Sequence, residues 1–365
     1  MRSFFKFIYK ILCLIVLVAF LISCFTQFIH PTQFSFIALF SLAFPYLFLL
    51  MIALIIFSFF VNKRMAIFLL ICLLCGYKNL STSFAFNFSS QWNAQKQDSS
   101  LRIMTWNVED FVNLLYGSEV RAQMLNLITQ NNPDVLCVQE FTEVEGAKWR
   151  ASVRKELDSM GYKYCLLSKD QSWSSSIERN TTRGTAIFSK LPFLDSCRFN
   201  VRKHEMNENA VYATILFNNK PLRIYTTHLA SFQIYKDTAN ANKDIYKITY
   251  DRKRAVEYRI RETEIAHERE VKIIRDSISK SPYPVIYCGD INSTPCSYTY
   301  RMLKNNLQDA FLTKGFGIGA TFYKILPTLR IDVCLVDPKF KIDQCTVVKR
   351  KLSDHYPIVT DIRWK

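Results

Sequence analysis

The stretch Val285-Ile286-Tyr287-Cys288-Gly289-Asp290-Ile291-Asn292-Ser293-Thr294-Pro295 joins an apolar run to a polar turn. Its first four residues are β-branched, aromatic or otherwise apolar, which predicts a short buried strand. Asp290 and Asn292 follow at the end of that strand, where a rigid scaffold can present polar side chains to a ligand. The stretch therefore predicts a functional loop that follows a core strand.

Polar residues stand at the ends of other apolar runs in the same way. They occur in the strings Trp106-Asn107, Gln139-Glu140, Thr227-His228, Arg330-Ile331-Asp332 and Ser353-Asp354-His355. Any one of them alone would more often be a turn, a helix cap or a surface charge. The candidate site is therefore the whole set, which comprises Asn107, Glu140, His228, Asp290, Asn292, Asp332, Asp354 and His355.

Extended and helical segments alternate beyond residue 100. Residues 120–129 predict a helix, and residues 132–134 predict a turn into the next strand. Strand composition recurs at residues 101–108, 135–138, 184–188, 211–217, 222–227 and 285–288. Such alternation is typical of an α/β domain.

Three motifs carry a family resemblance: G-D-x-N-S-T-P at 289–295, R-I-D at 330–332 and S-D-H at 353–355. Together they resemble the endonuclease/exonuclease/phosphatase superfamily over residues 101–365. This is the fold of pancreatic deoxyribonuclease, the abasic-site endonucleases, inositol polyphosphate 5-phosphatases and neutral sphingomyelinases. Further agreement at 297–300 and 321–322 resembles the bacterial membrane-anchored branch. The resemblance implies a two-sheet α/β sandwich with the site where strand-end loops of both sheets converge.

The candidate residue types suit phosphoester chemistry without reference to any family. Carboxylate and amide oxygens are hard ligands of the kind that Mg²⁺ and Mn²⁺ prefer. Hydrolysis of a phosphoester requires a metal ion to neutralise the phosphoryl oxygens, a group that activates water, and donors that hold the transition state. We therefore expect Mg²⁺ or Mn²⁺ as the cofactor and a phosphoester in nucleic acid, a phospholipid headgroup or a small molecule as the substrate.

The resemblance also implies a role for each candidate residue. Glu140 would be the principal metal ligand, with Asn107 beside it and Asp354 contributing through water or a second ion. The number of metal ions stays open. These three residues are therefore the expected metal ligands.

The other five candidates are expected to act on the substrate and on water. By resemblance, Asp290 would orient or deprotonate the attacking water, and Asn292 would donate a hydrogen bond to the phosphate. His355, oriented by Asp332, would hold the phosphate or transfer a proton. His228 would contact the scissile phosphate or assist the leaving group. The resemblance leaves open which of these groups is the general base.

The N-terminal part has the composition of a membrane anchor, because the first 97 residues contain no Asp or Glu. Uncharged runs at residues 11–29 and 34–61 reach the length of about 20 residues that crosses a bilayer core. Residues 65–77 form a shorter apolar run, which a helix continuing through residue 80 or beyond would lengthen. We expect an anchor of two or three spans at 1–80, a linker rich in Ser, Asn and Gln at 81–100, and a catalytic domain at 101–365.

Basic residues predict the orientation of the anchor. Arg2, Lys6 and Lys10 precede the first run, and Lys63 and Arg64 separate the second from the third. The positive-inside rule then places the N-terminus and the second loop in the cytoplasm. Three spans, which we favour, put the catalytic domain outside the cytoplasm, as on a bacterial inner membrane, whereas two would leave it inside. Alternatively, the first run is a secretory or lipoprotein signal, and the second span remains.

The part of the chain after the anchor is moderately basic. From residue 81 on, 41 basic residues face 31 acidic ones, a net charge of +10 that suits an anionic substrate or a membrane surface.

Local composition predicts where several other residues lie. Residues 235–280 hold 12 basic and 9 acidic residues, which is too mixed for a nucleic-acid patch. They predict a mostly solvated helix with His267 on its surface. His204, among charged residues, is also expected at the surface. The cysteines lack CxxC spacing; Cys137, Cys288 and Cys334 are expected to pack in the core.

The function expected from the sequence is that of a membrane-anchored, divalent-metal-dependent phosphoesterase. The enzyme could be a nuclease, or it could act on lipids or small molecules. The sequence does not decide between these substrates, because no basic stripe with interleaved aromatics marks a nucleic-acid groove. Tethering near a bilayer favours encounters with headgroups. The alternative is a catalytically inactive binding or scaffolding module with the same fold. The lipid bilayer is an expected partner, and no protein partner is implied.

Overall fold

The computed structural model describes residues 2–34, 36–89, 91–112, 118–144, 152–173, 180–202, 209–232 and 245–365. Contacts divide the chain into two compact units. The first comprises Met1–Phe84, Ser231–Glu268 and Ser293–Arg301, and the second comprises Ala85–Ala230, Arg269–Asn292 and Met302–Lys365. The division into anchor, linker and catalytic domain at residues 80 and 100 stays a prediction.

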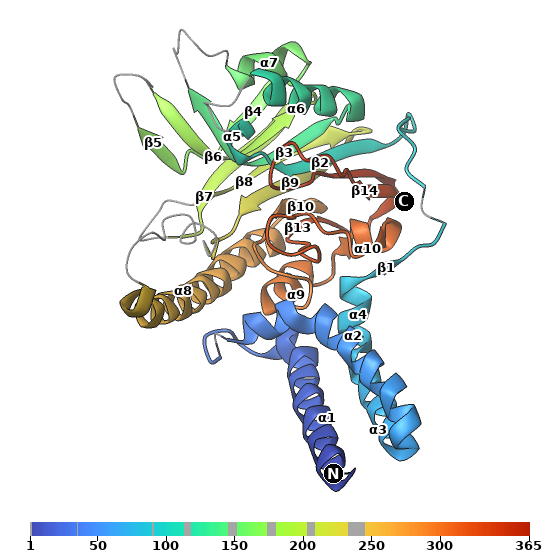
Figure 1. Ribbon diagram of the computed structural model, residues 1–365. Coiled ribbons are helices and arrows are strands. Elements are labelled where there is room, and N and C mark those ends of the chain that lie inside the picture. The colour runs from blue at the N-terminus through green and yellow to red at the C-terminus, as the bar shows by residue number, and fades with distance from the viewer. Residues whose placement is uncertain are drawn as a thin grey trace. The chain divides into compact units, whose positions relative to one another are not determined.

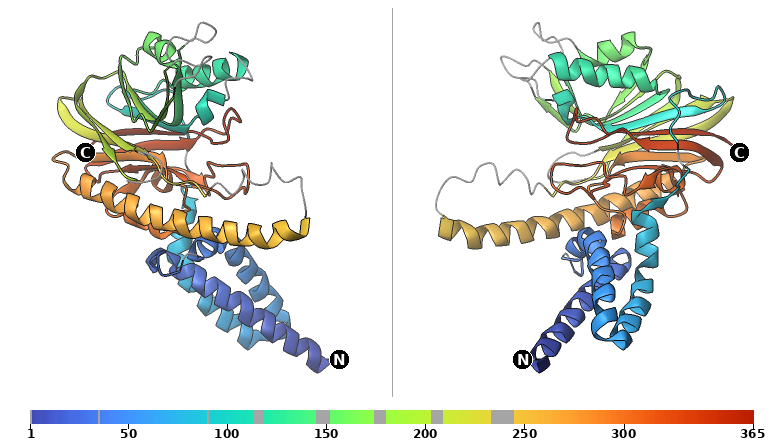
Figure 2. Two further views of the ribbon diagram at one scale, coloured as in Figure 1. Left: turned by 90° about the vertical axis from the view of Figure 1, so that its left-hand side faces the viewer. Right: turned by 45° about the vertical axis from the view of Figure 1, so that its right-hand side comes forward.

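The first unit is built on N-terminal helices, namely α1 (Arg2–Phe25), α2 (Ile37–Val61), α3 (Lys63–Leu73) and α4 (Tyr77–Ser83). Three helical segments are long and apolar enough to cross a membrane: Phe4–Phe28, Ile37–Val61 and Lys63–Ser83. The third has 21 residues, which at 1.5 Å each give about 30 Å, the thickness of a bilayer core. By length and composition, these helices agree in number with the three-span prediction. Figure 2 shows them packed together.

The three N-terminal segments bury one side and expose another. Phe20, Phe44, Met51 and Leu69 are each at most 1% exposed and form part of a shared apolar cluster. Many other apolar side chains face outward, and Phe60 is 82% exposed. Apolar surface of this extent is unfavourable in water, and a lipid bilayer is the environment that it suits.

The second unit contains two large sheets, shown in Figure 1. One has the order β14-β15-β2-β3-β6-β4, with β5 also paired to β6, and the other has the order β11-β13-β10-β9-β8-β7. The strands of the first are β2 (Leu101–Asn107), β3 (Val135–Val144), β4 (Tyr164–Leu167), β5 (Gln171–Trp173), β6 (Thr181–Ser189), β14 (Phe340–Val347) and β15 (Ile358–Trp364). Those of the second are β7 (Phe193–Asn200), β8 (Asn209–Phe217), β9 (Lys220–His228), β10 (Val285–Asp290), β11 (Gln308–Asp309) and β13 (Asp332–Val336).

Residue alternation along the strands builds the core of this unit. In β2, Leu101 and Ile103 pack with residues from both sheets, including Ile224 and Ile286. The intervening residues point to the opposite face, because successive side chains of a strand alternate. Cys137, Cys288 and Cys334 lie in the same core as small apolar groups, as predicted.

Helices cover the outer faces of both sheets (Figure 1). The helices α6 (Ser118–Asn131) and α7 (Val153–Ser159) pack against the first sheet, and Met124 and Leu157 are fully buried there. The C-terminal end of α8 (Ile245–Ser279) contacts the second sheet, where Tyr225 Oη donates to the Ser277 carbonyl at 3.1 Å. The short helices α5 (Glu109–Val112), α9 (Tyr298–Lys304) and α10 (Ala310–Lys314) follow strands or loops. This arrangement confirms the predicted α/β sandwich preceded by N-terminal helices.

One sequence expectation about α8 is wrong. The helix forms, but His267 is fully buried and packs edge-on against the ring of Phe232. The reason is a buried stripe with helical spacing, formed by Ile260, Glu264, His267, Val271, Ile274 and Ile278. Residues three and four apart share one helix face, so a helix rich in charge can still bury one side. His204 lies outside the described residues.

The segment expected as a linker contains regular structure. The strand β1 (Ala85–Phe86) pairs antiparallel with β12 (Phe316–Gly317) in a small third sheet. Farther along, the backbone N–H of Asn93 donates to Gln344 Oε1 at 2.9 Å, and Gln344 Nε2 donates back to the Asn93 carbonyl. These bonds hold part of the segment against the strands of the second unit.

Candidate active site

Strand pairing brings polar strand ends of each sheet together. In the first sheet β2 runs parallel to β3, so that Asn107 lies beside Gln139, and Glu140 follows it. In the second sheet β9 runs parallel to β10, and His228 pairs with Asp290. Because carboxyl ends of parallel strands meet at one sheet edge, residues far apart in the sequence converge there.

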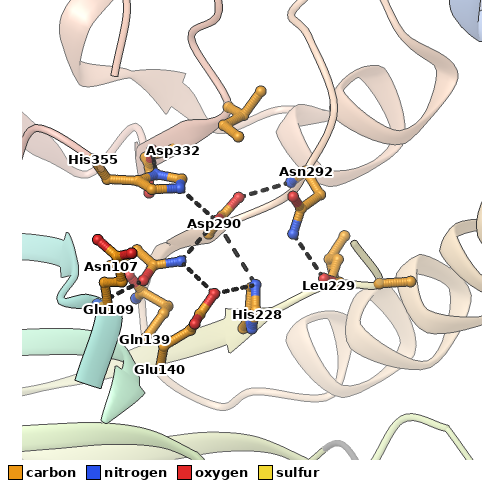
Figure 3. Close-up of polar contacts among 12 residues, drawn as sticks. Asn107, Glu109, Gln139, Glu140, His228, Leu229, Asp290, Asn292, Asp332 and His355 are labelled. Carbon is orange, nitrogen blue, oxygen red and sulfur yellow. Dashed lines mark hydrogen bonds and ion pairs between the residues drawn. The ribbon is translucent and has the colours of Figure 1, made fainter. Parts of the chain in front are cut away.

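Asn107 connects the two sheets through its side-chain amide. Its Nδ2 donates to Asp290 Oδ2 at 3.1 Å and to Glu140 Oε1 at 3.2 Å (Figure 3). Asn107 and Asp290 are each 1% exposed. A buried amide whose two N–H groups are both used has little freedom to rotate, so Asn107 fixes the relative positions of the two carboxylates.

The backbone at Glu140 is bent by a β-bulge. The β3–β6 register shifts between Val138 and Phe141, and Glu140 has a φ of 51°. A bulge turns the side chain of its extra residue out of the regular alternation. Asn292 also has a positive φ, of 47°. This backbone region is costly for Glu140, whereas Asn adopts it more readily than most residues other than glycine.

Asp290, Asp332 and His355 form a buried triad. His355 Nδ1 lies 2.8 Å from Asp332 Oδ2, and its Nε2 lies 3.6 Å from Asp290 Oδ2. Burial and the neighbouring Asp332 carboxylate raise the pKa of Asp290 to about 6. Burial lowers the pKa of His355, but the carboxylates of Asp332 and Asp290 outweigh it and raise that pKa to about 10. The triad therefore couples an imidazolium to a carboxylate that can accept a proton near neutral pH.

His228 and Asn292 lie beside Asp290. His228 Nε2 is 3.8 Å from both Glu140 Oε1 and Asp290 Oδ2. The backbone N–H of Asn292 donates to Asp290 Oδ1 at 2.9 Å, and Asn292 Nδ2 donates to the Leu229 carbonyl at 2.9 Å (Figure 3). The Leu229 bond uses one amide hydrogen of Asn292, which leaves the second as a donor for a ligand.

Asp354 lies among other carboxylates. Its backbone N–H donates to Glu109 Oε2 at 3.2 Å, and its Oδ1 is 4.0 Å from His355 Nε2. Burial raises the pKa of Asp354; His355 opposes this rise, and the carboxylates of Glu109 and Glu140 add to it. Carboxylates that repel one another in this way are stabilised by a bound cation.

Two residues of this site, Glu109 and Arg183, were missed by the sequence analysis. Glu109 stands two positions after Asn107, and its backbone N–H donates to Asn107 Oδ1 at 3.2 Å. The i, i+2 spacing next to a strand is the signal that could have found it. Arg183 pairs with Glu140 and, at 3.1 Å, with Asp110 Oδ1. No local pattern marks Arg183, because a charged residue within a strand is usually a solvated one.

Arg183 and His228 set the charge state of Glu140. Burial raises the pKa of Glu140, but His228, Arg183 and the Asn107 hydrogen bond outweigh it, and the pKa lies below its usual value. Glu140 is therefore ionised at neutral pH. An ionised carboxylate held by several neighbours is a suitable ligand for a hard cation.

The residues present fit a divalent cation. Ligand atoms of Asp290, Asp332 and His355 all lie within 4.8 Å of one another, and all three residues are buried. The imidazole in this group already bonds to Asp332. The oxygens of Glu140, Asn107, Asp354 and Glu109 form a second donor set, in which burial raises the pKa of Asp354 and the neighbouring carboxylates of Glu109 and Glu140 add to the rise. Oxygen-rich, negatively charged sets of this kind bind Mg²⁺ or Mn²⁺.

Comparison with known proteins places this fold in a class. The model of the Endonuclease/Exonuclease/phosphatase family matches residues 104–355, well over half of the chain. The chain therefore belongs to this family, whose members are generally hydrolytic phosphoesterases. A second model, a domain of unknown function (DUF8431), matches residues 4–83. No curated protein matches the chain.

Solved structures share the fold at low identity. An endonuclease/exonuclease/phosphatase from Beutenbergia cavernae has a TM-score of 0.52 at 17% identity, covering 73% of this chain and 72% of that one. The human Nocturnin catalytic domain with bound sulfate has a TM-score of 0.54 at 18% identity, covering 74% and 95%. D. rerio TDP2 with a single-strand DNA product has a TM-score of 0.50 at 18% identity, covering 73% and 100%. These likenesses concern the fold alone.

Proposed function

We propose that the chain is a membrane-anchored phosphoesterase that needs Mg²⁺ or Mn²⁺ to hydrolyse a phosphodiester or phosphomonoester. The observation that carries this proposal is the environment of Asp290 Oδ2. It accepts a hydrogen bond from Asn107 and lies 3.6 Å from His355 Nε2 and 3.8 Å from His228 Nε2. One buried carboxylate oxygen thus lies among two imidazoles and an amide, a set suited to proton transfer beside an anionic substrate.

Glu140, Asn107 and Asp354 would hold the metal ion, with Glu109 beside them. When it is bound, the ion would neutralise the negative charge of the phosphoryl oxygens. Asn107 Nδ2 donates to both Glu140 and Asp290, and its Oδ1 accepts the Glu109 backbone N–H at 3.2 Å, so Oδ1 would have to share or give up that bond to serve as a ligand. Glu140 and Asp354 are therefore the principal candidates for anionic ligands.

The residues of the chain have separable roles in this mechanism. Asp290 orients the attacking water and accepts its proton, for which the raised pKa near 6 is suited. His355, kept protonated by Asp332, donates from Nε2 to a phosphoryl oxygen. Asn292 donates its second amide hydrogen to the phosphate, and His228 supports the leaving group.

The anchor places this chemistry on a membrane. We propose an inner-membrane location in a bacterium, with the N-terminus inside and the catalytic domain outside the cytoplasm. The support is the asymmetry of the basic residues, since Lys63 and Arg64 lie in the loop before the third span. Nucleic acid, phospholipid headgroups and small phosphate esters are the substrate classes to be distinguished.

Substrate profiling of the full chain in lipid nanodiscs tests the proposal. The panel is DNA, RNA, sphingomyelin, phosphoinositides, nucleotides and bis(p-nitrophenyl) phosphate, each assayed with Mg²⁺ and with EDTA. We expect hydrolysis of at least one class, abolished by chelation and restored by Mg²⁺ or Mn²⁺. Absence of hydrolysis across the panel, or full turnover by metal-free protein, would contradict the proposal and favour the inactive module.

A further inference from the structure

The segment Ser293–Arg301, here called the docking segment, begins immediately after Asn292 and includes the S-Y-T-Y string at 297–300. It belongs to the same compact unit as the membrane helices. Most of its side chains are buried, each at most 8% exposed: Ser293, Cys296, Ser297, Tyr298, Thr299 and Tyr300. A polar loop that buries so many side chains needs partners for its polar groups.

The first and third membrane segments supply several of these partners. Thr26 Oγ1 donates to the Cys296 carbonyl at 2.6 Å, and Ser83 Oγ lies within hydrogen-bond distance of Cys296 Sγ, at 2.9 Å. Arg301 Nε donates to the Gln27 carbonyl at 2.7 Å. Cys296 also joins the apolar cluster of the membrane helices. The docking segment is thus held at its middle and at its end.

The loop between the first two spans and the second span add further contacts. The rings of His30 and Tyr298 lie 4.7 Å apart, and His30 Nδ1 is 3.4 Å from Glu268 Oε1. Thr294 Oγ1 donates to Ser41 Oγ at 3.3 Å. All three membrane segments therefore contact the docking segment within this unit, and the loop after the first segment also contacts α8.

Polar side chains within the membrane helices explain how this surface is built. Gln27 Nε2 donates to Asn79 Oδ1 at 2.9 Å, and Asn79 Nδ2 donates to the Ser23 carbonyl at 2.7 Å. Gln27 and Asn79 are at most 2% exposed. Buried amides at the ends of apolar helices are costly unless bonded, so these two are best explained as parts of a fixed polar end.

We propose that the membrane helices position the catalytic loop, with Thr26 and Ser83 as positioning residues that act through the docking segment. This inference rests on the proposed function. Asn292 has a φ of 47°, and its N–H holds Asp290 Oδ1 at 2.9 Å. Asn adopts this left-handed conformation more readily than most residues do, so the contacts of the loop decide how firmly it is kept. One peptide bond links Asn292 to Ser293, so release of the docking segment removes a restraint next to Asn292 and loosens the N–H bond that holds Asp290.

The test uses the full chain in nanodiscs of phosphatidylethanolamine and phosphatidylglycerol. Thr26→Val removes the hydroxyl that bonds Cys296 at nearly constant side-chain volume, and Ser83→Ala removes the second bond from another span. Hydrogen exchange of the amides at 291–301 is measured with kcat and KM for bis(p-nitrophenyl) phosphate and Mg²⁺. We expect faster exchange in both variants and a fall in kcat of about 10- to 100-fold, with KM little changed, because small misplacements of catalytic groups act on kcat.

Matched variants distinguish a positioning role from a general loss of folding stability. Thr26→Ser keeps the hydroxyl and should restore wild-type exchange and kcat. Thr129→Val makes the same change on α6, where the exposed Thr129 donates to the Leu125 carbonyl of its own helix, and should behave as wild type. Thermal unfolding midpoints should stay close to that of the wild type.

Each outcome decides the proposal. Unchanged exchange at 291–301 in both Thr26→Val and Ser83→Ala overturns it, and so does faster exchange with unchanged kcat. If the wild type hydrolyses nothing, the proposed function fails, and the exchange contrast between Thr26→Val and Thr26→Ser still shows whether the membrane helices hold the loop.

Discussion

Asn107 Nδ2 and Asp290 Oδ2, 3.1 Å apart, join the end of β2 in one sheet to the end of β10 in the other. The two residues are 183 positions apart in the sequence. Their bond lies beside the Glu140 carboxylate and the imidazoles of His228 and His355. The site therefore depends on the packing of the two sheets, and a change at Asp290 acts on both.

Replacement of the buried carboxylate tests the role of Asp290. Asp290→Asn should lower kcat by about 10² to 10⁴, the range for loss of a positioned proton-transfer group. The pKa of Asp290 is raised from 3.8 to about 6 in the folded state, so its ionisation costs folding stability progressively across that range and fully above it, and the neutral amide removes that cost. The thermal midpoint at pH 8 should therefore be unchanged or higher. Wild-type turnover in this variant would show that the site is assigned wrongly.

Replacement of the principal candidate ligand tests the metal site. Glu140→Gln should raise the Mg²⁺ concentration for half-maximal activity, because the amide offers a weaker ligand than an ionised carboxylate. Magnesium titrations of initial rates measure the change. Glu119→Gln makes the same substitution on the exposed surface of α6 and should leave the titration as in the wild type. An unchanged titration for Glu140→Gln would exclude Glu140 as a ligand.

Arg183 should affect the same titration in the opposite direction. Its guanidinium pairs with Glu140 and Asp110 and competes with a cation for these carboxylates. Arg183→Ala should therefore lower the half-saturating Mg²⁺ concentration a few-fold, whereas Arg183→Lys keeps the charge and should stay near the wild type. A higher Mg²⁺ requirement in Arg183→Ala would mean that Arg183 chiefly orients Glu140 for the metal.

The pH profile should have two limbs set by Asp290 and His355. The pKa of Asp290 is raised to about 6, so kcat/KM should fall as the pH drops below that value and the base becomes protonated. The pKa of His355 is raised to about 10, so its imidazolium should be lost only in strong alkali. Asp332→Asn removes a carboxylate that raises the His355 pKa and should shift the alkaline limb to lower pH. An alkaline limb that stays in place would argue against His355 as the donor.

Topology is tested by reporter fusions. A reporter joined after Ser100 should be active only if it is of the kind that works outside the cytoplasm, because three spans follow a cytoplasmic N-terminus. A fusion in the loop after Val61 serves as the cytoplasmic control. Activity of a cytoplasmic reporter after Ser100 would remove the third segment from the set of spans.

Much of the fold follows from local patterns. Residues 285–288 read as a buried strand because four apolar residues in a row suit a strand covered on both faces, and β10 is fully buried. The apolar spans follow from their lack of charge over lengths of about 20 residues. The polar residues at strand ends were found as a set, because each one interrupts an apolar run.

The contacts that bring these residues together as a site come from segments that are distant in the sequence. The β-bulge that turns Glu140 depends on pairing with β6, which lies some forty positions away in the sequence. Arg183 looks like a solvated charge until β6 lies against β3 and brings it to Glu140. His267 looks exposed on a helix rich in charge until one face of α8 packs against the chain.

Sequence by itself determined the apolar N-terminal runs and several core strands of this protein, since hydrophobic periodicity and charge act over a few neighbouring residues. It also determined which polar side chains stand at strand ends. Only the tertiary structure decided which of them touch, because hydrogen bonds and ion pairs depend on distances of a few ångströms that sheet order and bulges set. The bond between Asn107 and Asp290 exists because two sheets pack face to face, and no segment shorter than the whole domain contains that information.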